Sequence, residues 1–160
     1  MARFMHFAPD EHAYMYLTKT IGLHRLHNVS PVRKALADST GTAQFCMDGS
    51  LGAGLSDYLQ FSVERLFQAV STISLSDAWA ELGEISRYVK TDIEGVEAAT
   101  VEGTHDFLKA RPIHFSIESD HLIKGERTCK PPEQLFKGIG YSCWSSDEFD
   151  QLFTWAEPPG

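Results

Sequence analysis

The sequence predicts a single α+β domain over residues 1–160, in which helices in the middle of the chain are inserted between small mixed or antiparallel sheets. Strand-like segments occur near both ends, helical periodicity is concentrated between them, and no linker, internal repeat or low-complexity segment divides the chain. Segregated strands and helices are typical of α+β rather than alternating α/β folds. With 160 residues, 42% of them hydrophobic, the chain is long enough to bury one core.

The first part of the chain is predicted to alternate between strands and helices. Asp10 is placed to cap the first helix, which is expected to end at Gly22. Ser30-Pro31, a hydroxyl followed by proline, is typical of the start of the second helix. In order, the predicted elements are a strand over 3–7, a helix over 11–20, a helix over 32–37 and a strand over 42–47.

The rest of the chain is predicted to contain helices followed by strands. The predicted elements are a strand at 58–61, helices beginning at Ser62 and at Ser76-Asp77, a strand over 112–118, a helix over 131–138 and a strand over 139–144. Residues 91–104 are expected to form an exposed connection with a short helical piece. The tail over 145–155 fits a strand or a helix, the latter with Ser145 and Glu148 as a capping box.

Residues 49–62 contain three glycines within six positions, followed directly by an aromatic, strand-like segment. Glycine allows a sharp turn and a close approach of the backbone to a ligand. The spacing is G-x-x-G-x-G, which matches neither the G-x-G-x-x-G of dinucleotide folds nor a P-loop. The run therefore predicts a turn that presents Tyr58, with a plain wide loop as the alternative.

Charge is distributed unevenly along the chain. Residues 1–60 carry five basic and five acidic residues, whereas residues 61–160 carry nine and seventeen, which accounts for the net charge of −8. This excess of acidic residues argues against broad binding of a phosphate backbone, so a protein is the favoured macromolecular partner over nucleic acid.

Three separated cysteines, with no leader-like start and no membrane-length apolar run, predict a cytoplasmic protein that has no membrane contact.

The order of these features resembles the mono-ADP-ribosyltransferase superfamily of the His–Tyr–Glu type, and residues 55–61 are similar to a stretch of DarT-type DNA ADP-ribosyltransferases. Three segments carry the resemblance. They are the strand Phe4-Met5-His6-Phe7, the glycine turn from Gly52 to Tyr58, and Lys137-Gly138-Ile139-Gly140-Tyr141 followed by Asp147-Glu148.

The resemblance implies a protein that binds NAD as substrate and transfers ADP-ribose to a macromolecular target, as a toxin, an effector or a phage-borne modifier. It implies no metal. An acidic group would stabilise the oxocarbenium-like ribose, and a tyrosine face would stack on nicotinamide. The implied catalytic residues are Glu148, Tyr58 and His6, and the implied NAD contacts are His6, Gly52, Gly54, Tyr58 and Ser62.

Each of these assignments has an alternative. Asp147, Glu126 and Glu118 compete with Glu148 for the acidic role, and Ser62 is equally suited to cap a helix. His6 also fits a partly buried strand histidine, and the histidines within residues 6–27 leave a weak case for a metal site. The alternative function is a non-enzymatic, acidic binding module, such as an immunity protein or an inhibitor of a basic partner.

Overall fold

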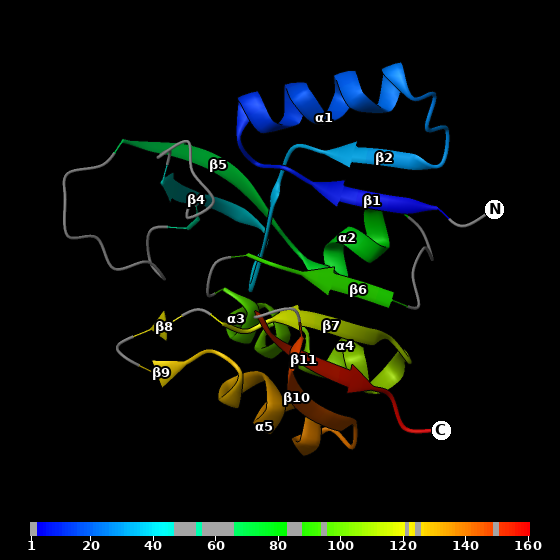
Figure 1. Ribbon diagram of the computed structural model, residues 1–160, viewed down its shortest axis with the longest axis vertical. Helices are drawn as coiled ribbons and strands as arrows, with labels where there is room; N and C mark the ends of the chain where they lie inside the picture. Colours follow the sequence, from blue (N-terminus) through cyan, green and yellow to red (C-terminus); the bar gives the residue numbers. More distant parts are fainter. Residues whose placement is uncertain are drawn as a thin grey trace.

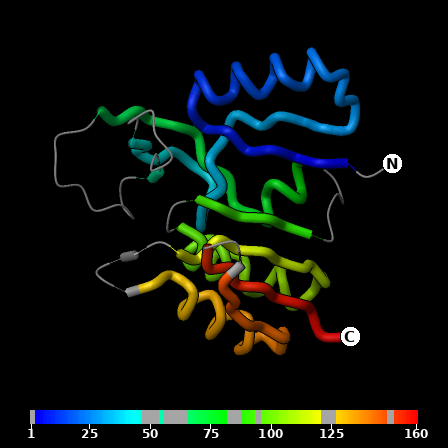
Figure 2. Tube along the Cα trace, in the orientation of Figure 1, coloured from blue at the N-terminus to red at the C-terminus, as the bar shows by residue number. Residues whose placement is uncertain are grey.

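The computed structural model describes residues 3–46, 54–55, 66–82, 88–93, 96–120, 122–123, 126–148 and 151–160. Within these residues the chain forms one small α+β domain, as predicted, with helices and several small sheets (Figure 1). Figure 2 shows the N-terminal part of the trace at one end of the molecule and the C-terminal third wound together at the other.

The N-terminal unit consists of strand β1 (Phe4–Phe7), helix α1 (Glu11–Leu23) and strand β2 (Val29–Val32), which pairs with β1 in parallel. The predicted cap is confirmed, because the Oδ1 atom of Asp10 accepts a hydrogen bond from the backbone N–H of Ala13 at 2.7 Å. The helix continues beyond its predicted end to Leu23, and none of its residues is buried.

The predicted helix over 32–37 is wrong. Its residues belong to the end of β2 and to strand β3 (Ala35–Ala37), whose three residues are all buried. Pro31 lies within β2 opposite His6, and β2 pairs with no described strand other than β1. Proline lacks an N–H group and is tolerated on such an edge strand, so tertiary pairing outweighs the local helix-start signal.

A second sheet joins β3 to strands β4 (Gly41–Cys46) and β5 (Phe67–Ser74), with β5 in the centre, parallel to β3 and antiparallel to β4. The strand predicted over 42–47 is confirmed through Cys46. The helix predicted from Ser62 through Val70 is wrong in its described part, because residues 67–74 form β5. The run Val70-Ser71-Thr72-Ile73 is rich in β-branched residues, which favour strands.

The largest sheet has the order β10-β11-β7-β6. Strands β6 and β7 are parallel, and β11 is antiparallel to both β7 and β10. The strand predicted over 112–118 is confirmed, and the ambiguous tail forms a hairpin, so the capping box at 145–148 is wrong. The strands are β6 (Tyr88–Thr91), β7 (His114–Glu118), β10 (Ser142–Glu148) and β11 (Gln151–Glu157), and a separate short pair is formed by β8 (Leu122–Ile123) and β9 (Glu126–Arg127).

Four further helices are described: α2 (Leu75–Leu82), α3 (Glu97–Glu102), α4 (His105–Ala110) and α5 (Lys130–Gly138). The predictions of α2 and α5 are confirmed, with prolines in the first turn of α5. The connection predicted over 91–104 does contain a short helix, α3. Its Thr100 and Val101 are buried rather than exposed, because α3 packs against α5 and β3.

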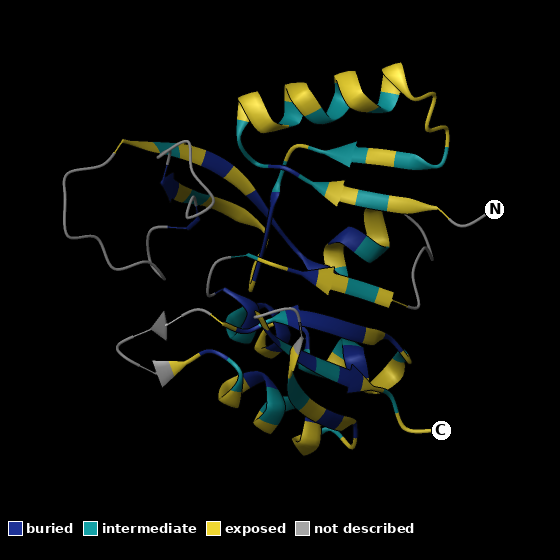
Figure 3. Ribbon diagram, viewed as in Figure 1, coloured by how far each residue is buried: buried dark blue, intermediate teal, exposed yellow. Residues whose placement is uncertain are grey.

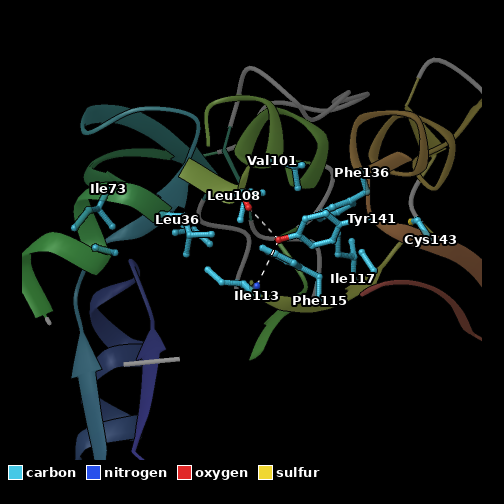
Figure 4. Close-up of a cluster of buried hydrophobic side chains, with 13 residues drawn as sticks. Leu36, Ile73, Val101, Leu108, Ile113, Phe115, Ile117, Phe136, Tyr141 and Cys143 are labelled. Atoms are coloured by element: carbon cyan, nitrogen blue, oxygen red, sulfur yellow. Dashed lines mark hydrogen bonds between the residues drawn. The ribbon is translucent and has the colours of Figure 1, made fainter. Parts of the chain in front are cut away.

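The main core lies between the largest sheet and helices α2 to α5 (Figure 3). The Phe136 ring contacts both Phe115 and Tyr141, with ring centroids 4.9 and 5.3 Å apart, and Figure 4 shows the three side chains in one cluster. The Tyr141 hydroxyl accepts a hydrogen bond from the N–H of Ile113 and lies within bonding distance of the carbonyl of Leu108. Tilted aromatic pairs of this kind bury a large apolar area in a defined geometry, which anchors α5 on the sheet.

Candidate functional site at the carboxyl ends of the parallel strands

The structure does not bring the residues predicted for the NAD site into one described cluster. Gly52, Tyr58 and Ser62 lie outside the described residues. Gly54 is buried, and its carbonyl accepts a hydrogen bond from the N–H of Cys46 at 2.8 Å. His6 is exposed on β1, whereas Glu148 ends β10, the outer strand of another sheet. The catalytic and NAD-binding roles given to these residues stay predictions.

Charged and polar groups gather where the parallel strands β6 and β7 end. Both strands finish at one edge of the largest sheet. Strand β11 is antiparallel to β7, with Phe153 opposite Glu118, so Gln151, at the start of β11, reaches the same edge. In open sheets with parallel strands, ligands bind in the crevice beyond the carboxyl ends of the strands.

A lysine lies between two carboxylates at this edge. The Nζ atom of Lys90 is 3.3 Å from the Oδ2 atom of Asp92 and 3.9 Å from the Oε2 atom of Glu118. The Nε2 atom of Gln151 donates a hydrogen bond to the Oε1 atom of Glu118 at 3.1 Å. We call Lys90, Asp92, Glu118 and Gln151 the carboxyl-end cluster. The Glu118 side chain is only 15% exposed, whereas that of Asp92 is 37% exposed, so Asp92 is the more exposed of the two carboxylates.

A second ion pair lies just beyond the end of β7. The Nη1 atom of Arg127 is 3.2 Å from a carboxylate oxygen of Asp120 and 4.0 Å from one of Asp147. Arg127 therefore links the segment after β7 to the end of β10, next to Glu148 in sequence. All three side chains are at least 40% exposed, so the energy of each pair is small.

The segment after β6 is held by a buried carboxylate. Glu97, only 1% exposed at the start of α3, accepts a hydrogen bond from the N–H of Ile93 at 2.9 Å. Thr91, the last residue of β6, is also buried, and its hydroxyl has no hydrogen-bond partner among the described residues. The bond to Glu97 fixes the backbone after Asp92, and the pairing of Thr91 with Ile117 fixes the backbone before it.

A further carboxylate, that of Asp10, follows the end of β1 by three residues. Asp10 uses Oδ1 to cap α1, and its Oδ2 atom is buried with no hydrogen-bond partner among the described residues. Figure 1 shows that β1 points in the same direction as β6 and β7, so its carboxyl end faces the same way. A buried carboxylate oxygen without a donor is costly, which favours a ligand group at this position.

Glu133 of α5 lies under the largest sheet, and its pKa is shifted from the ordinary value of a glutamate. Lys137 donates to its carboxylate at 2.7 Å, and Ser145 also donates to it. These bonds lower the pKa of Glu133 below its ordinary value. Burial raises the pKa of the nearby Cys143 thiol to about 11, with a smaller contribution from the Glu133 charge. This thiol is therefore inert at neutral pH.

Two hollows lie elsewhere, between α3, α4 and α5. The larger, of about 610 Å³, is lined by Glu102, His105, Phe107 and Leu135 among others, and the smaller, of about 350 Å³, shares three of its lining residues. Neither hollow is lined by a residue of the carboxyl-end cluster or by a buried polar side chain. We therefore place the candidate site at the carboxyl ends of the parallel strands. Polar side chains converge there, and ligands of parallel sheets bind at that end.

Comparison with known proteins identifies a similar fold. No family model and no curated protein matches the chain. The crystal structure of Methyltransferase FkbM from Methylobacillus flagellatus KT, determined at 2.20 Å, superposes with a TM-score of 0.63 over 97% of this chain, at 11% sequence identity. The chain shares the fold of the matched region of that protein. It spans 36% of the length of that methyltransferase.

This likeness corrects the functional interpretation of the sequence. The resemblance to the mono-ADP-ribosyltransferase superfamily is wrong, and so is the interpretation as an ADP-ribose-transferring toxin or effector. The motifs were a few residues long, and such segments specify neither strand order nor pairing. The alternative of an acidic inhibitor of a basic partner is not supported either. NAD binding as such, and a preference for a protein partner, stay predictions.

Sequence reasoning missed Lys90 and Asp92. It predicted a helix beginning at Ser76-Asp77 and an exposed connection over 91–104, whereas Tyr88–Thr91 is strand β6. The available signal was a short segment with three residues that favour strands, tyrosine, valine and threonine, followed directly by an aspartate. Glu118 was considered only as a rival to Glu148. Among the described residues, no helix is long and apolar enough to cross a bilayer.

Proposed function

We propose that this chain is a methyltransferase-fold domain that takes part in methyl transfer, with its polar site at the carboxyl ends of the parallel strands. The observation that carries the proposal is the superposition of 97% of the chain on part of Methyltransferase FkbM. The carboxyl-end cluster supports the proposal, because ligands of parallel sheets bind beyond the carboxyl ends of the strands.

The residues at these strand ends fit the usual methyl donor, S-adenosylmethionine. This donor supplies an electrophilic methyl group on a positively charged sulfonium. The buried Oδ2 atom of Asp10, which has no hydrogen-bond partner in the described part of the chain, suits a donor hydroxyl or ammonium group. The carboxylates of Asp92 and Asp120 give the edge a negative potential that attracts a cation, in a chain with a net charge of −8.

The carboxyl-end cluster also offers a group that can accept a proton. Methylation of a hydroxyl or an amine releases a proton, and a nearby carboxylate can take it up. Asp92 is the more exposed carboxylate and is paired with Lys90 at 3.3 Å, whereas the less exposed Glu118 lies 3.9 Å from Lys90 and also accepts a hydrogen bond from Gln151. We therefore assign proton acceptance to Asp92 and the positioning of Lys90 to Glu118.

Donor binding tests this proposal. Radiolabelled S-adenosylmethionine is equilibrated by dialysis with the 160-residue chain and with the variants Asp10→Asn and Asp106→Asn. Asparagine is also a good helix cap, so Asp10→Asn removes the charge at Oδ2 while keeping the cap. Asp106 is an exposed aspartate of α4 and serves as the matched control.

We expect saturable binding that is weakened about tenfold by Asp10→Asn, a loss of about 1.4 kcal/mol, and unchanged by Asp106→Asn. The absence of saturable binding up to about 1 mM donor, a ceiling that corresponds to about −4 kcal/mol, would overturn the proposal. Equal effects of the two variants would remove Asp10 from the site.

A further inference from the structure

The largest sheet has a core face and an outer face. Its core face carries Phe115, Ile117, Cys143 and Ala156, which belong to the main buried cluster. Among the described residues, α5 is the helix that packs most extensively on β10 and β11, and its Phe136 contacts Phe115 on this core face. Successive side chains of a strand point to opposite faces, so the residues between these core positions lie on the outer face, away from α5.

Aromatic side chains lie on the outer face of two neighbouring strands. The pairing register sets one row across β6, β7, β11 and β10, which consists of Lys90, Ser116, Trp155 and Trp144. Phe153 lies in the next row, directly opposite Glu118. The ring centroids of Phe153 and Trp155 are 6.2 Å apart, with 36° between the ring planes. We call Trp144, Phe153 and Trp155 the aromatic strip.

The aromatic strip is partly open to solvent. Trp144 is 43% exposed, and Phe153 and Trp155 are each partly exposed. Contiguous apolar side chains on a protein surface mark interaction sites. Rings set side by side on a sheet present a flat surface, which suits a ligand that has an apolar face of its own.

Hydrogen-bonding groups border the aromatic strip on the same face. The Nζ atom of Lys90 is 3.9 Å from the Oε2 atom of Glu118, and Gln151 donates to the Oε1 atom of Glu118 at 3.1 Å. Lysine offers only donors, a carboxylate offers only acceptors, and glutamine offers both. The strip therefore runs into the carboxyl-end cluster, where a ligand lying on it meets donors and acceptors together.

These groups discriminate between the ligands that stack on aromatic rings. Nucleobases stack on aromatic side chains of sheet faces, but the seventeen acidic and nine basic residues of 61–160 oppose a phosphate backbone. A cation would approach the charged Lys90, and a purely apolar ring would use none of the polar groups. A sugar ring has an apolar C–H face and a rim of hydroxyls, each of which both donates and accepts.

We propose that the outer face of β7, β11 and β10 binds a neutral carbohydrate, whose rings lie on Trp144 and Trp155. Its hydroxyls at one end bond to Lys90, Glu118 and Gln151. Four strands at about 4.8 Å spacing make the row about 14 Å long, so an oligosaccharide fits it better than a single sugar. This inference goes beyond the proposed function and does not depend on donor binding.

Affinity electrophoresis tests the proposal. The full chain is run in native gels that contain hydroxyethyl cellulose, glycogen, galactomannan or xyloglucan, all of which are neutral polysaccharides. We expect at least one of them to retard the wild type. Trp144→Ala and Trp155→Ala are expected to weaken the retardation about tenfold, whereas Trp144→Tyr, which keeps a ring, retains most of it. Trp79→Phe is the matched control, because Trp79 packs against Phe107 away from this face.

Oxidation of tryptophan by N-bromosuccinimide, followed by mass spectrometry, tests separately whether the face is open. The chain has three tryptophans, Trp79, Trp144 and Trp155. We expect Trp144 to react first and Trp79 last, since the Nε1 atom of Trp79 is buried. The polysaccharide that retards the chain is expected to protect Trp144 and Trp155 and to leave the reaction of Trp79 unchanged.

Three outcomes would overturn the proposal. The first is no retardation in any of the four gels, or retardation by polyuridylate alone, which would assign base stacking to the face. The second is retardation that survives both alanine variants in proteins whose circular dichroism shows them to be folded. The third is resistance of Trp144 to oxidation in the free chain, which would show that another part of the chain covers the strip. Every measurement omits S-adenosylmethionine, so these failures are separable from a failure of the proposed function.

Discussion

Ser145 and Thr154 stand opposite each other on β10 and β11, with their hydroxyl oxygens 2.8 Å apart. Ser145 donates its proton to Glu133, and Ser119 donates to Thr154 at 2.8 Å. Each hydroxyl has one proton, so that of Thr154 must point to Ser145. The three hydroxyls form a directional chain that ends on Glu133 and ties β7, β11 and β10 to α5.

Replacing Thr154 by valine is expected to lower the free energy of unfolding by about 2 kcal/mol, because it removes both hydrogen bonds of the Thr154 hydroxyl and leaves buried Ser119 with the carbonyl of Ile117, at 3.2 Å, as its acceptor. Thr154 is fully buried, and valine has nearly its shape. Urea denaturation of the wild type and Thr154→Val measures the change, with the exposed Thr42→Val of β4 as the control. A loss no larger than that of Thr42→Val would show that the chain contributes little.

Glu133 makes stability depend on pH in acid. Its pKa in the folded protein lies below the ordinary value of 4.5, chiefly because of the hydrogen bond from Lys137 and then that from Ser145. The resulting stabilisation is complete above about pH 4.5 and is lost as pH falls through the lower folded pKa. We expect Glu133→Gln to cost on the order of 1 kcal/mol at pH 7.

The cost of Glu133→Gln should shrink as pH falls through the lowered pKa of folded Glu133, because the wild-type carboxyl then becomes protonated too. Denaturant midpoints at pH 7 and at an acid pH measure this difference. Glu157→Gln, at the exposed end of β11, is the control and should change little at either pH. If Glu133→Gln lowers stability as much in acid as at neutral pH, the loss comes from altered packing of the side chain and not from its charge.

Gly103 is expected to tolerate no side chain. A Cβ atom built there would lie 2.3 Å from the carbonyl oxygen of Asp38, which belongs to the backbone between β3 and β4. Gly103→Ala should therefore cost about 1–3 kcal/mol through overpacking. Gly138→Ala is the matched control, since nothing lies within 4 Å of its Cβ position. Thermal unfolding of the two variants separates them, and equal melting temperatures would contradict the contact.

Cys143 should resist alkylation. With a pKa of about 11, its thiolate is only about a thousandth of the population at pH 8. Iodoacetamide labelling followed by mass spectrometry is expected to modify the partly exposed Cys129 first and Cys143 slowly. Labelling in urea, where the cysteines should react alike, is the control. Rapid modification of Cys143 in the folded protein would show that its strand opens readily.

Several local elements could be predicted from the sequence because their signals lie within a few residues. Asp10 caps α1, prolines open α5, and alternation marks β7. The failures share one cause. Ser30-Pro31 is locally typical of a helix start, and the residues after Ser62 are locally typical of a helix. Pro31 nevertheless lies in β2 and residues 67–74 form β5, because neighbouring strands supply their hydrogen-bond partners.

The candidate site was less accessible to sequence reasoning. Lys90 and Glu118 are 28 residues apart in the chain, and only the parallel pairing of β6 with β7 brings them to one edge. Glu148 was singled out for its sequence neighbours. The structure gives it another setting, at the end of a hairpin strand opposite Gln151.

By itself, the sequence determined an α+β class, the acidic bias of residues 61–160, and the helices and strands whose caps and alternation are local. Only the tertiary structure decided which strands pair and which charged groups meet. The physical reason is that a cap needs a few adjacent residues. Strand order and a polar cluster arise from hydrogen bonds and core packing between segments far apart in the chain.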